Sequence, residues 1–220
     1  MKTFSVFDII GPRMVGPSSS HTAGAVRIGN VVNKLAGGRI ASAVITLYGS
    51  FADTGRGHGT DRAIIAGLLG IPPDDNRVKF AMLLAKGEEV EISVKYSVEE
   101  TNHPNTAKVD VKTPEGKKIS VVGVSTGGGN IEIVEIDGME VSFTGNYPTI
   151  IAYYTDMPGI ISRVTAVLAK SNVNVAFMKV FRSAKRKRAC MVIEVDTPPA
   201  KELLDEIREK VNEIEEVNAI

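Results

Sequence analysis

The hydrophobic pattern near the start of the chain predicts a helix that begins directly after a polar segment. From Thr22 onward, apolar residues recur at helical spacing on one face, namely Ala25, Ile28, Val32 and Leu35. The Gly37-Gly38 pair predicts the end of this helix. A short apolar run from Phe4 to Ile10 comes earlier and is closed by Gly11-Pro12, which marks a turn toward the polar segment.

Alternating apolar and polar positions then predict a series of strands. Turn sequences such as Asp137-Gly138 join the later ones, so we expect an antiparallel sheet. Between the first two strands we expect a helix over Ala63–Leu69 and another over Asn76–Lys86. The strand-like segments are Ile40–Tyr48, Val90–Tyr96, Ala107–Lys112, Lys118–Val124, Ile131–Ile136 and Glu140–Phe143.

The pattern restarts after Thr144–Pro148 and predicts a second, smaller unit. Its order is βαββα, with room for a final edge strand at Val217–Ile220, which gives a four-stranded sheet with two helices on one face. The fold class is therefore α+β, with a first domain over residues 1–146 and a ferredoxin-like domain over 148–220. The segments of this second unit are the strands Thr149–Tyr154, Val173–Arg182 and Arg188–Val195 and the helices Ile160–Lys170 and Pro199–Ile214.

Composition and charge exclude several classes of protein. Among the 220 residues, 26 basic and 26 acidic side chains cancel, so the overall charge indicates no nucleic-acid and no membrane partner. The one basic cluster, at 185–188, lies between two strand-like runs and is interpreted as a solvated hairpin tip, with a phosphate-contacting patch as the alternative. No apolar run approaches the ~20 residues of a membrane helix, and the N-terminus lacks the apolar core of a signal peptide. We therefore expect a soluble, cytoplasmic protein.

The chain contains a single cysteine, Cys190, within an apolar run. A disulfide within the chain is therefore impossible, and so is an iron–sulfur cluster or a zinc site ligated by cysteines of this chain alone. A single cysteine also fits a reducing compartment.

The polar segment before the first helix carries the strongest candidate chemistry. Four hydroxyls and an imidazole lie at the predicted helix start, from Ser18, Ser19, Ser20, His21 and Thr22. One hydroxyl suffices to cap a helix, whereas the free backbone N–H groups of the first turn and the remaining hydroxyls form a cradle for a carboxylate or phosphate. We therefore favour a ligand site here over a simple helix cap.

Two glycine-rich segments add further candidates. The predicted loop 53–61 places three glycines around Arg56 and His58 before a helix start, which is again the geometry of an anion site, with a flexible surface loop as the alternative. Gly127 to Gly129 resemble the phosphate cup of pyridoxal-phosphate enzymes, but such a cup leads into a helix and the following residues alternate like a strand. We interpret them as a hairpin turn or as a loop that admits a small ligand. His103 is interpreted as a loop histidine.

The second unit resembles an ACT domain, a module that in many enzymes of amino-acid metabolism binds an effector amino acid between paired copies. The resemblance rests on Asp156-Met157-Pro158-Gly159-Ile160 and on Asn172-Val173-Asn174-Val175. It implies self-association through this domain and a small amino acid as ligand, although some such modules only dimerise. The implied effector-binding residues are Asp156, Pro158, Gly159, Asn172 and Asn174.

The first unit resembles the β subunit or β domain of the iron–sulfur-dependent L-serine dehydratases. The resemblance is carried by the segments 5–12, 16–24 and 54–61, which read SVFDIIGP, GPSSSHTAG and TGRGHGTD. It implies a two-chain lyase that converts L-serine to pyruvate and ammonia. In that family a [4Fe–4S] cluster acts as a Lewis acid on the substrate hydroxyl. Because Cys190 stands alone, the cluster would be ligated by a separate α subunit and not by this chain.

The same resemblance implies roles for the candidate residues. His21 and His58 would be catalytic, as hydrogen-bonding or proton-transfer groups, since imidazole titrates near neutral pH. The substrate would be held by Ser18, Ser19, Ser20, Thr22, Gly127, Gly128 and Asn130. Related domains serve as effector-binding modules in some phosphoglycerate dehydrogenases, so a non-catalytic amino-acid sensor is the main alternative. A pyridoxal-phosphate dehydratase is a third option.

Overall fold

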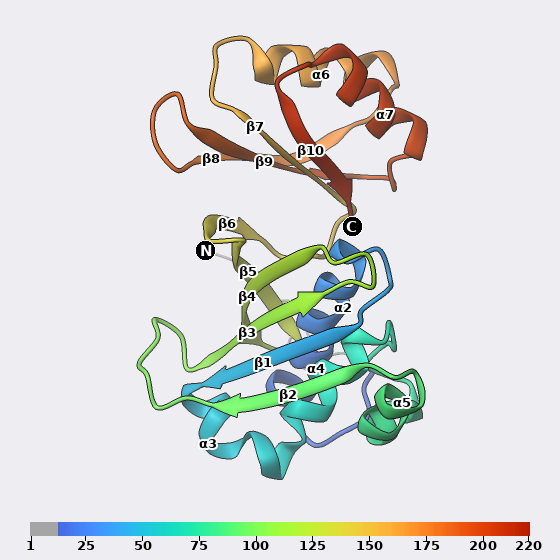
Figure 1. Cartoon of the computed structure of the whole chain (residues 1–220), viewed down its shortest axis with the longest axis vertical. Helices are drawn as coiled ribbons and strands as arrows, with labels where there is room; N and C mark the ends of the chain where they lie inside the picture. The colour runs from blue at the N-terminus through green and yellow to red at the C-terminus, as the bar shows by residue number, and fades with distance from the viewer. Residues whose placement is uncertain (1–12) are drawn as a thin grey trace. The chain divides into compact units, whose positions relative to one another are not determined.

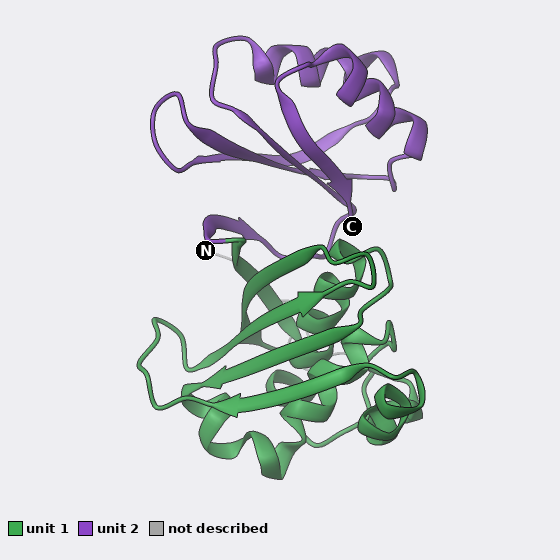
Figure 2. Ribbon diagram, viewed as in Figure 1, with its two compact units in different colours: residues 1–137 green, residues 138–220 purple. Residues whose placement is uncertain are grey.

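A computed structural model describes residues 13–220 of the chain (Figure 1). Two compact units divide the chain after residue 137 (Figure 2). The predicted run Phe4–Ile10, the turn Gly11-Pro12 and the first of the three family motifs lie outside the described residues. No helix within residues 13–220 is long and apolar enough to cross a membrane.

The first sheet has six strands in the order β2-β1-β3-β4-β5-β6. The predicted antiparallel series from Val90–Tyr96 onward is wrong at its first pair, because β1 lies between β2 and β3, parallel to β2 and antiparallel to β3. A parallel pair needs a long crossover, and the helices between β1 and β2 supply it. The strands are β1 Ser42–Tyr48, β2 Glu91–Tyr96, β3 Asn105–Lys112, β4 Lys118–Gly127, β5 Asn130–Ile136 and β6 Met139–Phe143.

The helices of the first unit start with a π-helix, η1 Ser19–Gly24, which continues as the α-helix α2 Ala25–Leu35. The predicted apolar face of α2 is confirmed, because Ala25, Ile28, Val32 and Leu35 are all buried. Helices α2 and α4 lie together on one face of the sheet (Figure 1). The other helical elements are α3 Gly49–His58, α4 Thr60–Leu68, the 3₁₀-helix η2 Asn76–Phe80 and α5 Ala81–Gly87.

Two predictions about these helices were wrong. Residues 53–58 were expected in a loop but belong to α3, and the chain breaks only at Gly59, which adopts a left-handed conformation with φ of 69°. Glycine costs a helix only ~1 kcal/mol, and the burial of Phe51 and Gly55 on α3 outweighs that cost. The single helix expected over Asn76–Lys86 is divided into η2 and α5.

Helices α2 and α4 cross at two glycines. A Cβ atom on Gly67 would lie 2.1 Å from the carbonyl oxygen of Val26, and one on Gly29 would lie 2.3 Å from that of Ile64. The two backbones are therefore in direct contact. Asn33 fixes the same contact, since its side-chain amide donates to the carbonyl of Leu68 at 2.7 Å.

The second unit contains a four-stranded antiparallel sheet in the order β10-β7-β9-β8, with α6 and α7 on one face (Figure 1). This confirms the predicted βαββαβ order. Three residues of the basic cluster, 185–187, lie in the turn between β8 and β9, and Arg188 begins β9. The predicted helix Pro199–Ile214 was too long, because Ile214 already begins β10. The elements are β7 Thr149–Thr155, α6 Ile160–Lys170, β8 Val175–Arg182, β9 Arg188–Val195, α7 Lys201–Lys210 and β10 Ile214–Ala219.

Candidate functional site

The serine-rich segment forms the π-helix η1, and Ser18 caps it. The Ser18 hydroxyl oxygen accepts from the backbone N–H of His21 at 3.1 Å, so the predicted N-cap is present. Thr22 is buried, and its hydroxyl donates to the backbone carbonyl of His58 at 3.5 Å. Ser18 and Thr22 are thus occupied within the chain, whereas Ser19 and Ser20 are half-buried. Short π-helical turns are frequent at functional sites.

His21 is held by three hydroxyl groups. Its Nε2 lies 3.0 Å from Thr54 Oγ1 and 3.1 Å from Ser50 Oγ, and its Nδ1 lies 3.4 Å from Ser18 Oγ. The Thr54 hydroxyl has one proton and donates it to the carbonyl of Ser50 at 2.8 Å, so it accepts from His21. Nε2 therefore carries the proton of the neutral ring, and both ring nitrogens of His21 are engaged.

His58 lies in the last turn of α3, next to His21. The two ring centroids are 4.8 Å apart, with the planes tilted by 37°. His58 Nδ1 lies 3.1 Å from the backbone carbonyl of Thr54, and because a carbonyl only accepts, Nδ1 is the donor. In the neutral ring Nε2 is then an open acceptor, and no hydrogen-bond partner reaches it from residues 13–220. His58 was predicted in a loop before a helix start. It instead ends α3, and the next helix, α4, begins after Gly59 at Thr60.

The environment of His21 disfavours its charged form. Burial lowers the pKa of the His21 imidazole below its ordinary value of 6.5, a hydrogen bond with Ser50 opposes this shift, and the neighbouring His58 adds to it. Phe51 also packs edge-on against the ring, with centroids 5.1 Å apart. His21 is therefore suited to a neutral, positioning role at pH 7.

A cavity of about 290 Å³ opens beside His58. Its wall includes Gly16, Thr22 and the 56–59 segment, together with three cationic residues, Arg56, Arg62 and Lys79. No Asp or Glu is among the described residues that line it. The cavity therefore complements an anion such as a carboxylate.

Sequence reasoning named Arg56 but missed Arg62 and Lys79. Arg62 lies three residues beyond the left-handed Gly59. Lys79 reaches the cavity from η2, more than twenty residues from His58 along the chain. Arg56 is also oriented by Tyr96, since its guanidinium carbon lies 4.5 Å from the centre of that ring. No local sequence signal connects Lys79 to the histidines.

The glycine triplet forms the predicted hairpin turn between β4 and β5 and lies near the serine-rich segment. A Cβ atom on Gly127 would be 4.0 Å from Ser20 Oγ. Arg27 of α2 donates to the carbonyl of Gly129 at 2.9 Å, which holds the turn against the helix. Gly128 is half-buried in this turn, and Asn130 is exposed at the first position of β5.

The serine dehydratase beta chain family matches residues 4–95, and the ACT domain family matches residues 149–212. A probable L-serine dehydratase beta chain from Bacillus subtilis is 45% identical over 98% of this chain and 97% of its own length. The chain belongs to the serine dehydratase beta chain family. A second member, the L-serine dehydratase beta chain of Peptoniphilus asaccharolyticus, is 39% identical over 90% of each chain. D-3-phosphoglycerate dehydrogenase from Synechocystis is 29% identical over 83% of this chain but only 33% of its own length.

This serine dehydratase beta chain does not fit an iron–sulfur cluster. Its one cysteine, Cys190, is fully buried in β9, and burial raises the pKa of the thiol to about 12. A cluster needs several thiolates, which a lone protonated thiol does not provide. Within residues 13–220, no three His, Cys, Asp or Glu side chains gather as metal ligands.

The ACT domain of this beta chain engages Asp156 internally. Its Oδ2 accepts from the backbone N–H of Arg186 at 3.0 Å and lies 3.7 Å from the Arg182 guanidinium. Gly159, next to Pro158, has a φ of 88° and gives α6 its tight entry, as predicted.

Within one copy, the predicted effector residues fall into two groups. Asp156, Pro158 and Gly159 precede α6, whereas Asn172 and Asn174 follow it. An eleven-residue helix is about 16 Å long, so one copy does not bring the two groups together. Asn174 instead donates to the Asp196 carboxylate at 2.6 Å.

Proposed function

We propose that this chain is the β subunit of an L-serine dehydratase, which converts L-serine to pyruvate and ammonia together with an α subunit that carries a [4Fe–4S] cluster. The observation that best supports this function is the His21–His58 pair beside a cationic cavity in a member of the beta chain family. The names of the two full-length relatives support the reaction, and the single buried cysteine supports a separate chain as the holder of the cluster.

The two histidines have different roles in this proposal. His58 is the proton-transfer group, because its Nδ1 is fixed as a donor and its Nε2 is left as an acceptor. His21 positions it, since both nitrogens of His21 are already engaged and its pKa is lowered by burial. Thr54 joins the two rings, because its carbonyl accepts from His58 and its hydroxyl accepts from His21.

The substrate carboxylate is proposed to lie where the serine-rich segment meets the cavity. Ser19 and Ser20 offer hydroxyls, while Ser18 and Thr22 shape the segment through their internal hydrogen bonds. Arg56, Arg62 and Lys79 supply the positive charge that attracts an amino acid's carboxylate. Gly127, Gly128 and Asn130 are proposed to bound the substrate on the side of Ser20, since a Cβ atom on Gly127 would lie 4.0 Å from Ser20 Oγ.

The domain assignment is part of the same proposal. Residues 1–146 form the serine dehydratase β domain, and residues 148–220 form an ACT domain that self-associates and binds a small amino acid. The inclusion of β6 in the first sheet supports a boundary after residue 143, and the ACT family match begins at residue 149. A cytoplasmic location agrees with the single reduced cysteine.

Anaerobic turnover of serine to pyruvate, measured with the α subunit, tests this function. We expect His58→Ala to lower kcat on the order of 10²–10⁴-fold while the variant still binds the α subunit. His103→Ala is the matched control, because His103 lies in the loop before β3 and its Nδ1 only accepts from the backbone of Asn105. Wild-type turnover by His58→Ala would remove His58 from the chemistry, and no turnover by the wild-type pair would reject the function.

A second function is favoured by one observation, the match to phosphoglycerate dehydrogenase over 83% of this chain. In this alternative the chain is a non-catalytic amino-acid sensor that uses the same cavity. Affinity purification separates the two. Co-purification of a cysteine-rich partner with the brown colour of an iron–sulfur cluster supports the dehydratase, and its consistent absence supports the sensor.

A further inference from the structure

Three large apolar side chains are exposed together around the start of α5. Phe80, Met82 and Leu83 are 59%, 49% and 69% exposed, and we call these three residues the α5 patch. Ala81 and Ala85 are buried instead. At about 100° per residue, Leu83 lies on the side of the helix opposite these two alanines. A surface helix normally buries its large apolar residues and exposes polar ones, whereas α5 exposes large apolar residues and buries alanines. The α5 patch therefore marks an interaction surface.

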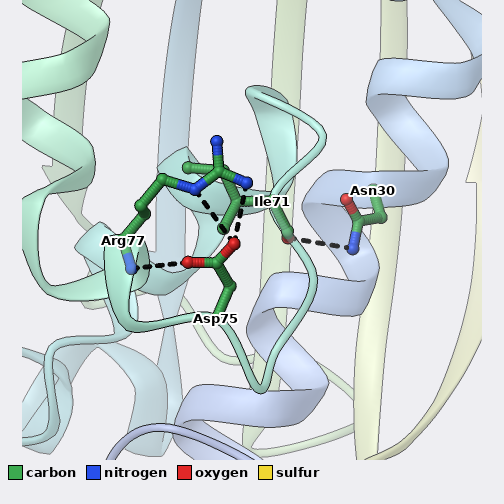
Figure 3. Close-up of polar contacts among 4 residues, drawn as sticks. All are labelled: Asn30, Ile71, Asp75 and Arg77. Atoms are coloured by element: carbon green, nitrogen blue, oxygen red, sulfur yellow. Dashed lines mark hydrogen bonds and ion pairs between the residues drawn. The ribbon is translucent and has the colours of Figure 1, made fainter.

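The segment that leads into the α5 patch is held in place. Asp75 caps η2 by accepting from the backbone N–H of Arg77 at 2.8 Å, and its other oxygen accepts from the Arg77 guanidinium at 2.7 and 2.9 Å (Figure 3). Asn30 of α2 donates to the carbonyl of Ile71 at 3.4 Å, as Figure 3 also shows. The patch is therefore presented from a segment that is anchored to the core helix α2.

The α5 patch continues directly from the wall of the cavity. Val78 and Lys79 line the cavity together with His58, and Phe80 is the next residue. Val15 also lines the cavity, and its backbone N–H donates to the carbonyl of Pro73 at 2.7 Å, so a second part of the wall is joined to the segment that precedes the patch. A partner that covers the mouth of this cavity will therefore meet the α5 patch.

We propose that the α5 patch is part of the surface on which the α subunit docks. This inference rests on the proposed function, which makes the α subunit the partner that completes the site beside His58. Apolar anchors surrounded by polar groups form the centre of most protein interfaces. Lys79 and Lys86 flank the patch along the chain and are both exposed. The docking face of the α subunit accordingly presents apolar side chains with carboxylates beside them.

Affinity between the two subunits tests the inference separately from turnover. We expect Leu83→Asp to raise the Kd for the α subunit at least about tenfold, because it places a charge at the centre of a buried apolar contact. Val98→Asp is the matched control. Val98 is fully exposed two residues after β2 ends at Tyr96, and its variant should bind within twofold of wild type. Equal affinity of Leu83→Asp and wild type would overturn the inference. Failure of the wild-type chain to bind the α subunit would reject the proposed function itself.

Cysteine labelling gives a second readout that does not depend on a disruptive variant. Cys190 is fully buried, so Leu83→Cys introduces one accessible thiol. We expect the α subunit to slow maleimide labelling at position 83 at least tenfold, read by mass spectrometry of this chain, and to leave Val98→Cys unaffected. Unchanged labelling at position 83 in the complex would overturn the inference. The inference would also be overturned if labelling at position 83 slowed as the concentration of this chain alone was raised, because that result would assign the patch to contact with a second copy.

Discussion

The imidazole rings of His21 and His58 lie 4.8 Å apart, and Thr54 contacts both. A positive charge on the neighbouring His58 would repel one on His21, which adds to the lowering of the His21 pKa by burial. Burial lowers the pKa of His21, and the Nδ1–H of His58 donates to the Thr54 carbonyl, which leaves Nε2 of the neutral His58 ring as an acceptor. The two rings therefore lie in different environments, which supports the different roles proposed for them.

The lowered pKa of His21 predicts a pH dependence of stability. Between the folded pKa and the ordinary value of 6.5, the unfolded chain binds more protons than the folded chain. The stability that depends on a neutral His21 is therefore fully present above pH 6.5, and it is lost as the pH falls through the pKa of His21 in the folded protein. We expect the free energy of unfolding, from urea titrations between pH 5 and 8, to fall toward pH 5.

The variant His21→Gln removes this titration and should flatten that part of the curve. His103→Gln changes a histidine outside the pair and should retain the wild-type slope. An identical slope in His21→Gln and wild type would show that His21 does not carry the effect.

The close crossing of α2 and α4 at Gly29 and Gly67 predicts that one added methyl group lowers the stability of the fold. In Gly67→Ala the new Cβ would lie 2.1 Å from the carbonyl oxygen of Val26 and 2.7 Å from the Cα of Gly29, so backbone and not a flexible side chain must move. We expect a loss of about 1–3 kcal/mol or more in the free energy of unfolding. Gly87→Ala is the matched control, since no atom lies within 4 Å of the added Cβ and the stability should not fall. Equal unfolding midpoints for the two variants would contradict the close crossing.

Elements with a regular apolar period were predictable from the sequence. The face of α2 and the βαββαβ order of the second unit follow from spacing alone, and the structure confirms both. Helix α3 was not predictable in this way. Gly55, Gly57 and Gly59 indicate a loop, whereas the burial of Phe51 and the packing of Gly55 against Thr60 stabilise the helix up to His58. The parallel β1–β2 pair was also missed, since strand periodicity does not encode direction.

The candidate site was predictable in part for similar reasons. His21 and His58 were identified because each lies in a dense local motif, and the structure places their rings together. Lys79 and Arg62 carry no such motif, and only the packing of η2 and α4 brings them to the cavity. The hydroxyls of Ser18 and Thr22 look like free ligand groups in the sequence, but both have intrachain hydrogen bonds.

The edge of the second sheet predicts how the ACT domain pairs. Strand β8 is an edge strand in the order β10-β7-β9-β8, paired with β9, and it exposes Phe177 and Val180. An exposed apolar edge strand is a template for a second copy. We expect Val180→Lys to lower the molar mass of the assembly measured by light scattering. Ile161→Lys on α6 replaces an equally exposed apolar residue, 45% against 42%, and should leave the mass unchanged. A lower mass for the α6 variant and not for the β8 variant would place the pairing on the helices instead.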